Sequence, residues 1–381
     1  GVAGAYFGQS VSGAGDVNGD GLDDVIVGQS FYSAISPTRT SAGMAVVVFG
    51  KRSGWVDIDM STFTAADDLG FRVIGKYASG FLGKSVSEAG DVNGDGFADV
   101  IFSAPLADYS SRSDSGLVYV LFGHSNTSSF PDIDLNIWSG GNNLGFAIGG
   151  AKASDGVGTI VTGGLDLNHD NFSDIVVGSA YIGHIYVLFG HDTSSPFNTI
   201  DLLVLSSGSQ SWGFRLTGAA SSTNWMALSL SPAGDLNADG IDDLVIGSPM
   251  SSYAEREECG VAYIIYGQSA EYAFENVNLS SVSHGVPGFS VFGTAAGDLF
   301  GYSVGGGADI NADGVSDLVI GALYADPYGR LSAGTVNILF GRSDGVWGDI
   351  DTANISPDRG YQIYGGVKYD NLGYSVALTK D

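Results

Sequence analysis

The chain has 381 residues, of which 59 are glycine and 44% are hydrophobic, so it can bury a core and is not a disordered acidic tail. The formal net charge is −27, which excludes the basic surface that a nucleic-acid partner or an anionic membrane requires. No run of about 18 apolar residues is present, so no membrane insertion is expected, and the single cysteine, Cys259, excludes an internal disulfide.

An acidic nine-residue segment occurs five times along the chain. Its first aspartates are Asp16, Asp91, Asp166, Asp235 and Asp309, which are 75, 75, 69 and 74 residues apart. Tandem self-similarity at such a period is the mark of a repeat architecture. The sequence therefore predicts one domain over residues 1–381, built from repeats at about 1–75, 76–150, 151–218, 219–293 and 294–366, with 367–381 as the first strand of a further repeat.

Each repeat predicts four short strands in a fixed order. Strand one precedes the acidic segment, as in 7–12, and strand two follows it as a β-branched run, as in 25–27. Strand three ends in a Phe-Gly or Tyr-Gly pair, as in 118–122, and strand four follows a Gly-aromatic pair, as in 71–74. An Ile-Asp pair such as Ile58-Asp59 lies between strands three and four in four repeats, and the fourth repeat has Val277-Asn278.

No segment shows a sustained helical period, so the chain is predicted to be all-β. Four strands per repeat favour a β-propeller of four-stranded antiparallel blades. A β-solenoid is the alternative, although its coils are usually much shorter than about 75 residues. Residues 373–376 repeat strand one, which puts Asp381 at the first position of a sixth acidic loop. We therefore expect the protein to continue, with more than five blades in the intact ring.

The acidic segment has the pattern D-x-N-x-D-x-x-x-D, which gathers hard oxygen ligands in one turn. Side chains at positions 1, 3, 5 and 9 and the backbone carbonyl of position 7 suit calcium better than magnesium, and the absence of thiolate or imidazole sets disfavours zinc and copper. Position 6 is glycine in four loops and Asn171 in the third, as a left-handed turn requires. The predicted ligands of about five calcium ions are Asp16, Asn18, Asp20, Leu22 and Asp24; Asp91, Asn93, Asp95, Phe97 and Asp99; Asp166, Asn168, Asp170, Phe172 and Asp174; Asp235, Asn237, Asp239, Ile241 and Asp243; and Asp309, Asn311, Asp313, Val315 and Asp317.

Two other interpretations of these loops were weighed. An EF-hand is excluded, because position 12 is an apolar strand residue rather than glutamate. A metal-free Asx turn is the alternative, but several carboxylates in each of five turns repel one another unless a cation is bound. Because one loop supplies every ligand, the predicted metal role is structural rather than catalytic.

The residues Phe7-Gly8, the loop 16–24 and elements such as Ser103-Ala-Pro105 resemble the FG-GAP repeats of the N-terminal propeller of integrin α subunits. The Phe-Gly element is weaker in the third and fourth repeats, where it is Val157-Gly158 and Met226-Ala227. The resemblance covers almost the whole chain and implies a calcium-bearing propeller, usually seven-bladed, that serves as an extracellular adhesion or binding platform; the intact ring is thus expected to hold up to seven blades. The longer repeat and the five loops look more like bacterial secreted or surface proteins built from such repeats.

No catalytic constellation is predicted, so the chain is interpreted as a non-enzyme. The histidines have no metalloprotease spacing, and turn positions explain His124 and His191. His169 is expected to be exposed rather than a ligand, and Cys259 to be a small buried side chain rather than a nucleophile. The five tryptophans are expected to pack at blade rims, with a carbohydrate or protein contact as the alternative; they are Trp55, Trp138, Trp212, Trp225 and Trp347.

These features predict a calcium-stabilised binding or adhesion scaffold, secreted or at the cell surface, with a protein or glycan ligand. Three alternatives remain open: a lectin that binds sugars between blades, a surface-filament or sheath protein that self-associates, and a propeller attached to an enzyme, as in glycan-anchor phospholipases. The tryptophans occur in only some repeats, which counts against regular sugar sites.

Overall fold

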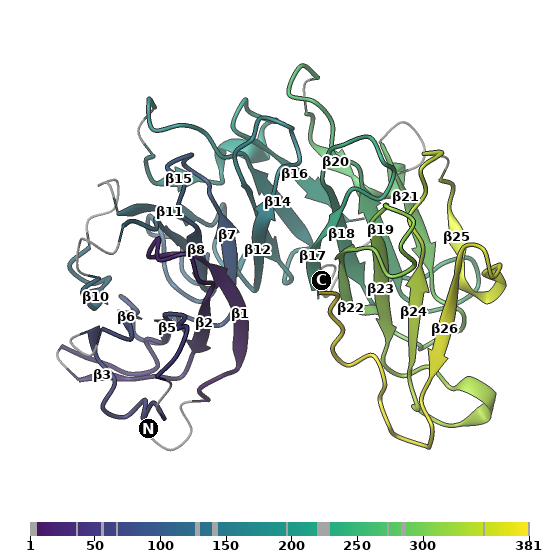
Figure 1. Cartoon of the computed structure of the whole chain (residues 1–381), viewed down its shortest axis with the longest axis horizontal. Helices are drawn as coiled ribbons and strands as arrows, with labels where there is room; N and C mark the ends of the chain where they lie inside the picture. Colours follow the sequence, from purple (N-terminus) through teal and green to yellow (C-terminus); the bar gives the residue numbers. More distant parts are fainter. Residues whose placement is uncertain are drawn as a thin grey trace. The chain divides into compact units, whose positions relative to one another are not determined.

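The computed structural model describes residues 6–35, 37–54, 57–65, 68–125, 130–138, 144–195, 197–218, 229–272, 274–282, 287–345 and 347–379. These residues form β-strands and short 3-10 turns and no α-helix, which confirms the all-β prediction (Figure 1). The 3-10 turns are η2 (Val204–Ser206), η3 (Leu279–Ser281), η4 (Pro327–Gly329) and η5 (Thr352–Asn354). In the described part of the chain, no helix has the length and apolar character needed to cross a membrane.

The chain divides into two compact units. The first contains Gly1–Gly164, Asn171–Ser179 and Tyr186–Gly213, and the second contains Leu165–Asp170, Ala180–Ile185 and Phe214–Asp381.

Two sheets lie wholly within the first unit. One has the order β1-β2-β5-β6-β10 and the other β15-β11-β9-β8-β7. Their strands are β1 (Ser10–Gly15), β2 (Asp24–Gln29), β5 (Met44–Val48), β6 (Gly70–Ile74), β7 (Val86–Gly90), β8 (Asp99–Ala104), β9 (Leu117–Leu121), β10 (Ile133–Asp134), β11 (Gly145–Gly149) and β15 (Ile200–Asp201). A two-residue ribbon of β3 (Ala34–Ile35) and β4 (Thr38–Arg39) lies in the connection between β2 and β5.

Two further sheets lie wholly within the second unit, with the orders β17-β18-β19-β21-β25 and β22-β23-β24-β26. Their strands are β17 (Ser229–Gly234), β18 (Asp243–Ser248), β19 (Val261–Ile265), β21 (Gly288–Phe292), β22 (Phe300–Ala308), β23 (Asp317–Ala322), β24 (Thr335–Leu339), β25 (Ile350–Asp351) and β26 (Gly360–Tyr364). The strands of the third repeat are β12 (Ile160–Leu165), β13 (Asp174–Ser179), β14 (His184–Leu188) and β16 (Gly213–Thr217), and β16 pairs with β20 (Val277–Asn278).

In the four sheets that lie within one unit, the first four strands along the chain are consecutive neighbours and antiparallel, as in a β-propeller blade. The prediction of four strands per blade is incomplete, however. In four sheets the Ile-Asp or Val-Asn pair of the following repeat adds a fifth strand, which runs parallel to strand four. This strand was missed because two residues show no periodicity; it lies beside strand four only in the folded chain. The repeat boundaries given above remain a prediction.

The core is built from strands two, three and four. Strand two is fully buried in β8, β13, β18 and β23, which confirms its prediction as a strand with both faces covered. In β2 the pattern differs, because Val25 is 47% exposed where its four counterparts are buried. Glycine permits close packing between neighbouring segments: a Cβ on Gly83 would lie 2.3 Å from the Met44 carbonyl oxygen.

The segment after β26 has a different conformation from the predicted strand. Residues 373–376 form no strand, although Leu372 makes an isolated parallel bridge with Gly334. The same bridge joins Leu82 to Gly43 at the start of the second repeat. Residues 372–379 therefore begin along the path of a repeat start. Asp381, the predicted first ligand of a sixth loop, lies outside the described residues.

Candidate metal centre

Each acidic loop connects the first and second strands of its sheet. In the first loop, β1 and β2 lose register between Gly13 and Gly15, and the irregularity leads directly into Asp16. The same shift occurs before the second, fourth and fifth loops. Each of these loops therefore begins at a β-bulge at the end of the hairpin, where strand pairing stops before the first predicted ligand.

The side chains at positions 1, 3 and 5 are held by the backbone of the loop. In the first loop, Asp16 accepts the N–H groups of Asp20 at 3.0 Å and Gly21 at 2.8 Å through its two carboxylate oxygens. Asn18 also accepts the Asp20 N–H, and Asp20 accepts the Leu22 N–H. The second, fourth and fifth loops repeat all four of these bonds. One local geometry thus orients the same oxygens in each of these loops.

The backbone turns left-handed at two positions of every loop. Position 6 has a φ of 82° at Gly21 and 69° at Asn171, which confirms the prediction for this position. Position 4 is also left-handed, with a φ of 68° at Gly19 and 57° at His169, which was not predicted from the sequence. The residue type there varies among glycine, histidine and alanine, so no single signal marked it. His169 is exposed, as expected.

The aspartate at position 9 is buried in all five loops, with exposures of 0 to 1%. Asp24 accepts the N–H groups of Val17 at 3.0 Å and Gly50 at 2.8 Å. The pKa of Asp24 is raised to about 6 and that of Asp243 to about 8, chiefly by burial; the nearby carboxylates at positions 1 and 5 act in the same direction, and the backbone hydrogen bonds oppose it. Burial likewise raises the pKa of Asp99 and Asp317. These carboxylates are desolvated beside like charges, a situation that a proton or a cation relieves.

The oxygen donors of the loops suit the requirements of a calcium ion. Among the described residues, no group of three or more His, Cys, Asp or Glu side chains is gathered as a metal cluster, because the loop carboxylates accept backbone N–H groups instead. A carboxylate oxygen has two lone pairs, so one N–H bond leaves a second acceptor position. In the first, second, fourth and fifth loops, no described carboxylate at positions 1, 5 or 9 pairs with Lys or Arg. Hard oxygen donors without a basic partner fit a hard divalent cation.

Successive loops are linked through their backbones. Ala98, at position 8 of the second loop, donates its N–H to the carbonyl of Asp16, and Ser316 donates likewise to Asp235. A Cβ on Gly19 would lie 2.3 Å from the Phe97 ring, so position 7 of one loop packs on position 4 of the loop before it. The loops therefore form part of the contact between neighbouring sheets.

The two histidines that follow Phe-Gly pairs belong to the same links. The backbone N–H groups of His124 and His191 donate to the carbonyls of Val17 and Val92. Their rings stack on Phe130 and Phe197, with centroids 3.7 and 3.9 Å apart. The structure thus places both at turns, as the sequence indicated.

The remaining candidate residues lie in packed surroundings. Cys259 is buried, and burial raises the pKa of its thiol, which agrees with a small core side chain. Trp138, Trp212 and Trp347 pack against the cores, and Trp347 stacks on Phe289 at 4.4 Å. Trp55, Trp225 and the Met226-Ala227 element lie outside the described residues.

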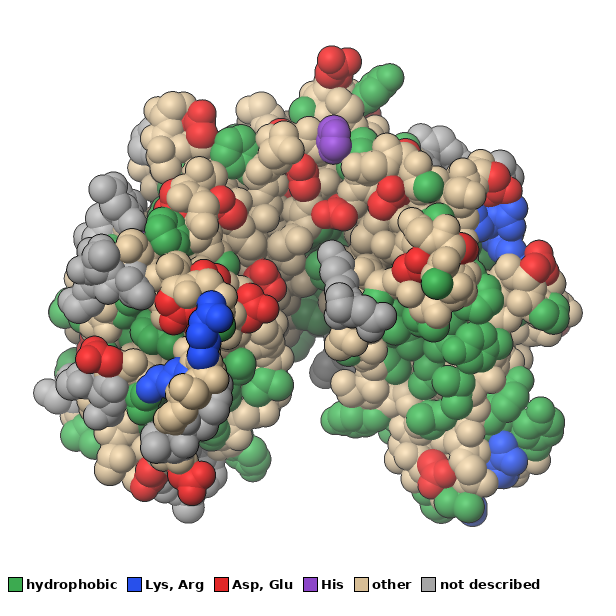
Figure 2. Space-filling view, viewed as in Figure 1, with side chains coloured by type: hydrophobic (Ala, Val, Ile, Leu, Met, Phe, Trp, Pro, Cys, Tyr) green, Lys and Arg blue, Asp and Glu red, His purple; other side chains and the backbone are tan. Residues whose placement is uncertain are grey.

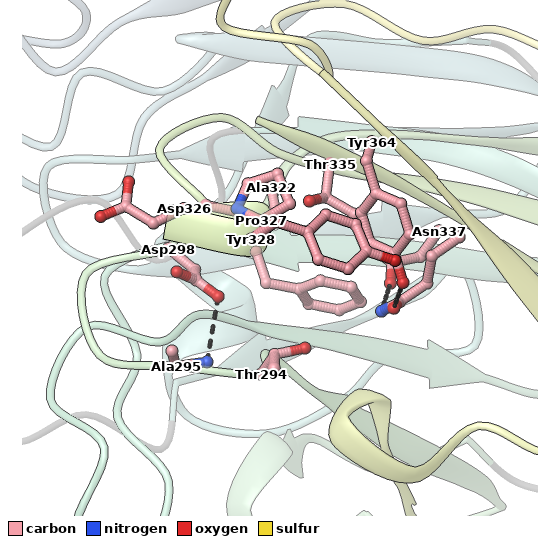
Figure 3. A pocket seen from close by; sticks show the side chains of 13 residues that line it. Thr294, Ala295, Asp298, Ala322, Asp326, Pro327, Tyr328, Thr335, Asn337 and Tyr364 are labelled. Atoms are coloured by element: carbon pink, nitrogen blue, oxygen red, sulfur yellow. Dashed lines mark hydrogen bonds between the residues drawn. The ribbon is translucent and has the colours of Figure 1, made fainter. Parts of the chain in front are cut away.

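A cavity of about 270 Å³ opens beside the last sheet (Figure 3). Its wall carries Asp298, Asp326 and Tyr328, together with Gln362 and Tyr364 from β26. Asp298 accepts the Ala295 N–H at 3.0 Å, and burial raises its pKa to about 6, with Asp326 adding a smaller effect of the same sign. No described histidine, cysteine or lysine lines the cavity beside these carboxylates.

The FG-GAP repeat model matches residues 7–48, 86–121, 227–264 and 300–339. These four segments are FG-GAP repeats. Each match spans the acidic loop and strands two and three of the first, second, fourth or fifth repeat. The third repeat, which has Val157-Gly158 and Asn171 in place of the usual residues, lies outside the four matched segments. The four matches and the blade-like sheets confirm the prediction of an integrin α-like propeller.

Several curated relatives align with the FG-GAP chain. It is 24% identical over 99% of its length to a phosphatidylinositol-glycan-specific phospholipase D of Dictyostelium discoideum, of which it covers 38%. It is 32% identical over 49% of its length to integrin alpha pat-2 of Caenorhabditis elegans, of which it covers 14%. The bovine phospholipase D of the same name is 28% identical over 58% of the chain, which covers 25% of that protein. The chain thus spans well under half the length of these relatives.

Proposed function

We propose that the FG-GAP chain is a calcium-stabilised, non-catalytic binding scaffold that acts outside the cell or at its surface. The observation that carries the proposal is the repeated loop, in which one hydrogen-bond pattern presents three carboxylates and an amide without a basic partner in four of the five copies. The similarity to integrin alpha chains supports a role in binding a protein ligand.

In this proposal the residues at positions 1, 3, 5 and 9 hold the ion with their side chains, and position 7 contributes its carbonyl. The buried position-9 aspartate has the largest effect, because a cation offsets both its desolvation and the charges of its neighbours. The loops also connect successive sheets, so bound calcium stabilises the contacts between sheets as well as the loops themselves. Calcium then replaces the disulfides that the single cysteine excludes.

The test is thermal unfolding with calcium and with excess EDTA. At a free calcium concentration 100 times the Kd, each independent site adds about 2.7 kcal/mol, so several sites give a large fall of Tm on chelation. Asp95→Ala is expected to lower the calcium stoichiometry from about five to about four, whereas Glu271→Ala, which removes an exposed carboxylate outside the loops, leaves it unchanged. An equal Tm in calcium and EDTA would contradict the proposal.

A second candidate is a propeller module of a larger hydrolase. Its support is the alignment of 99% of the chain with a phosphatidylinositol-glycan-specific phospholipase D. The full reading frame distinguishes the two candidates, since a catalytic domain beside the repeats would establish the second. We expect the isolated chain to show no release of a glycosylphosphatidylinositol-anchored protein from membranes; such release would contradict the non-catalytic assignment.

A further inference from the structure

One face of the last sheet, which carries the second and fourth residues of strand four, is exposed, whereas the same face of every other sheet is buried. The second and fourth residues of strand four are 0 to 2% exposed in the first four sheets; they are Phe71, Val73, Phe146, Ile148, Phe214, Leu216, Phe289 and Val291. In β26 the corresponding Tyr361 and Ile363 are each 45% exposed. Hydrophobic side chains gather over this sheet (Figure 2). This area is a core face with its cover missing among the described residues.

The covered sheets show what such a face accepts. Phe71 and Val73 share a core with Val100 and Leu121 of the following repeat. The following repeat also adds the two-residue parallel strand, in which Ile133 lies opposite Val73 and Asp134 opposite Ile74. The register is the same in the other three sheets. On β26, that register would place an isoleucine opposite Ile363 and an aspartate opposite Tyr364.

Polar residues on both sides of the isoleucine fix the added strand in place. The residue before it accepts a backbone N–H from the third residue of strand four: Asp132 accepts from Arg72 and Asp349 from Ser290, both at 2.9 Å. The aspartate after it pairs with an arginine of the connection between strands two and three. These pairs are Arg39–Asp134 at 2.7 Å, Arg112–Asp201 at 2.8 Å and Arg256–Asp351 at 2.7 Å.

The arginine of each pair stands five residues before strand three, at Arg39, Arg112 and Arg256. The third sheet has a short connection without arginine, and there the matching acid is Asn278. Arginine and aspartate are therefore present together or absent together. This agreement across repeats marks the pair as a recognition element between one repeat and the next.

Arg330 occupies the same position in the last sheet, five residues before β24. In the part of the chain that the structure describes, Arg330 forms no ion pair, and its Nε is buried without a hydrogen-bond partner. Its guanidinium lies over the Tyr328 ring at 5.1 Å, much as that of Arg112 lies over Tyr109 at 5.0 Å. Arg330 therefore lies over a tyrosine ring as Arg112 does, but it has no carboxylate partner among the described residues.

We infer that β26 and Arg330 form a docking site for an extended Asp-Ile-Asp segment of an adjoining FG-GAP repeat. The isoleucine lies on Ile363, the first aspartate accepts the Gln362 N–H, and the second aspartate pairs with Arg330. The path of residues 372–379 supports this occupant, because Ser303 Oγ donates to the Gly373 carbonyl as Ser229 Oγ donates to that of Gly301. The chain thus approaches the last sheet as a repeat start approaches the fourth. The site requires no bound metal.

The test uses the full chain and a labelled peptide with the sequence of residues 130–138, Phe-Pro-Asp-Ile-Asp-Leu-Asn-Ile-Trp. Saturable binding is expected by fluorescence anisotropy, equal in calcium and in EDTA. Arg330→Met is expected to weaken binding about tenfold, which is the loss of one ion pair of about 1.4 kcal/mol. Replacing the second aspartate of the peptide by asparagine is expected to weaken binding similarly, with no further loss on Arg330→Met.

Two controls keep the inference falsifiable. Arg342→Met removes an arginine outside the site and is expected to leave binding unchanged, and Arg330→Lys is expected to restore part of it if both variants keep the wild-type Tm. Absence of binding at millimolar peptide, or equal binding to Arg330→Met, would overturn the site. Sedimentation velocity tests the occupant: a monomer supports an adjoining repeat, whereas self-association abolished by Asp59→Asn would assign the site to a second copy instead.

Discussion

Asp298 provides a quantitative test of the electrostatics of the last sheet. It is 6% exposed, lies in the wall of the cavity of Figure 3 and accepts one backbone N–H, from Ala295. Its pKa is raised from 3.8 to about 6, chiefly by burial. The proposed change is Asp298→Asn, which keeps an oxygen that can accept the Ala295 N–H and removes the titratable charge.

The sign and size of the change in the free energy of unfolding follow from the linkage between folding and proton binding. Because the pKa is higher in the folded chain, the folded state binds the proton more tightly, and the resulting stability is fully present below pH 3.8 and is lost as the pH rises through about 6. The difference between the two pKa values corresponds to roughly 2 to 3 kcal/mol. Asp298→Asn is therefore expected to match the wild type near pH 4 and to exceed its free energy of unfolding by roughly that amount near pH 8.

The assay is urea unfolding followed by tryptophan fluorescence from pH 4 to pH 8 in EDTA, with the m-value compared between variants. The quantity of interest is the difference between variant and wild type, since other buried aspartates titrate in both. Glu271→Gln, an exposed carboxylate of the same unit, is the matched control and is expected to give a flat difference. A flat or falling difference for Asp298→Asn would refute the burial argument.

Three further predictions follow from the packing. Gly19→Ala is expected to destabilise the chain by roughly 1 to 3 kcal/mol more than Gly96→Ala in urea unfolding, because both glycines have positive φ but only a Cβ on Gly19 meets the Phe97 ring; equal losses would contradict this. Asn276→Asp is expected to raise the free energy of unfolding by about 1 kcal/mol, the worth of one ion pair, because Arg215 and Asn276 stand where Arg72 pairs with Asp132; a lower free energy of unfolding would argue against equivalence. Cys259 is expected to react with a disulfide reagent only on unfolding, because burial raises its pKa and covers its sulfur; rapid labelling of the native protein would show otherwise.

The sequence alone determined the features that repeat at short range. The acidic loop, the β-branched strand after it and the Phe-Gly turn each depend on neighbours within about ten residues, and five copies made their phase clear. The same argument placed His169 at the surface and Cys259 in the core. The calcium ligands remain a prediction from the loop pattern, which the structure supplements with a shared hydrogen-bond geometry.

Only the tertiary structure decided which segments of different repeats meet. The Ile-Asp pair was visible as a landmark, but its pairing with strand four of the preceding repeat joins residues about 60 apart, such as Ile133 and Val73. The arginine partners are farther still, with Arg39 and Asp134 separated by 95 residues. No local spacing encodes such contacts, because they depend on how one sheet packs on the next. The exposed face of β26 has the same cause: Tyr361 and Ile363 follow the strand-four pattern in sequence, and only their surroundings in the folded chain distinguish them from the buried Phe71 and Val73.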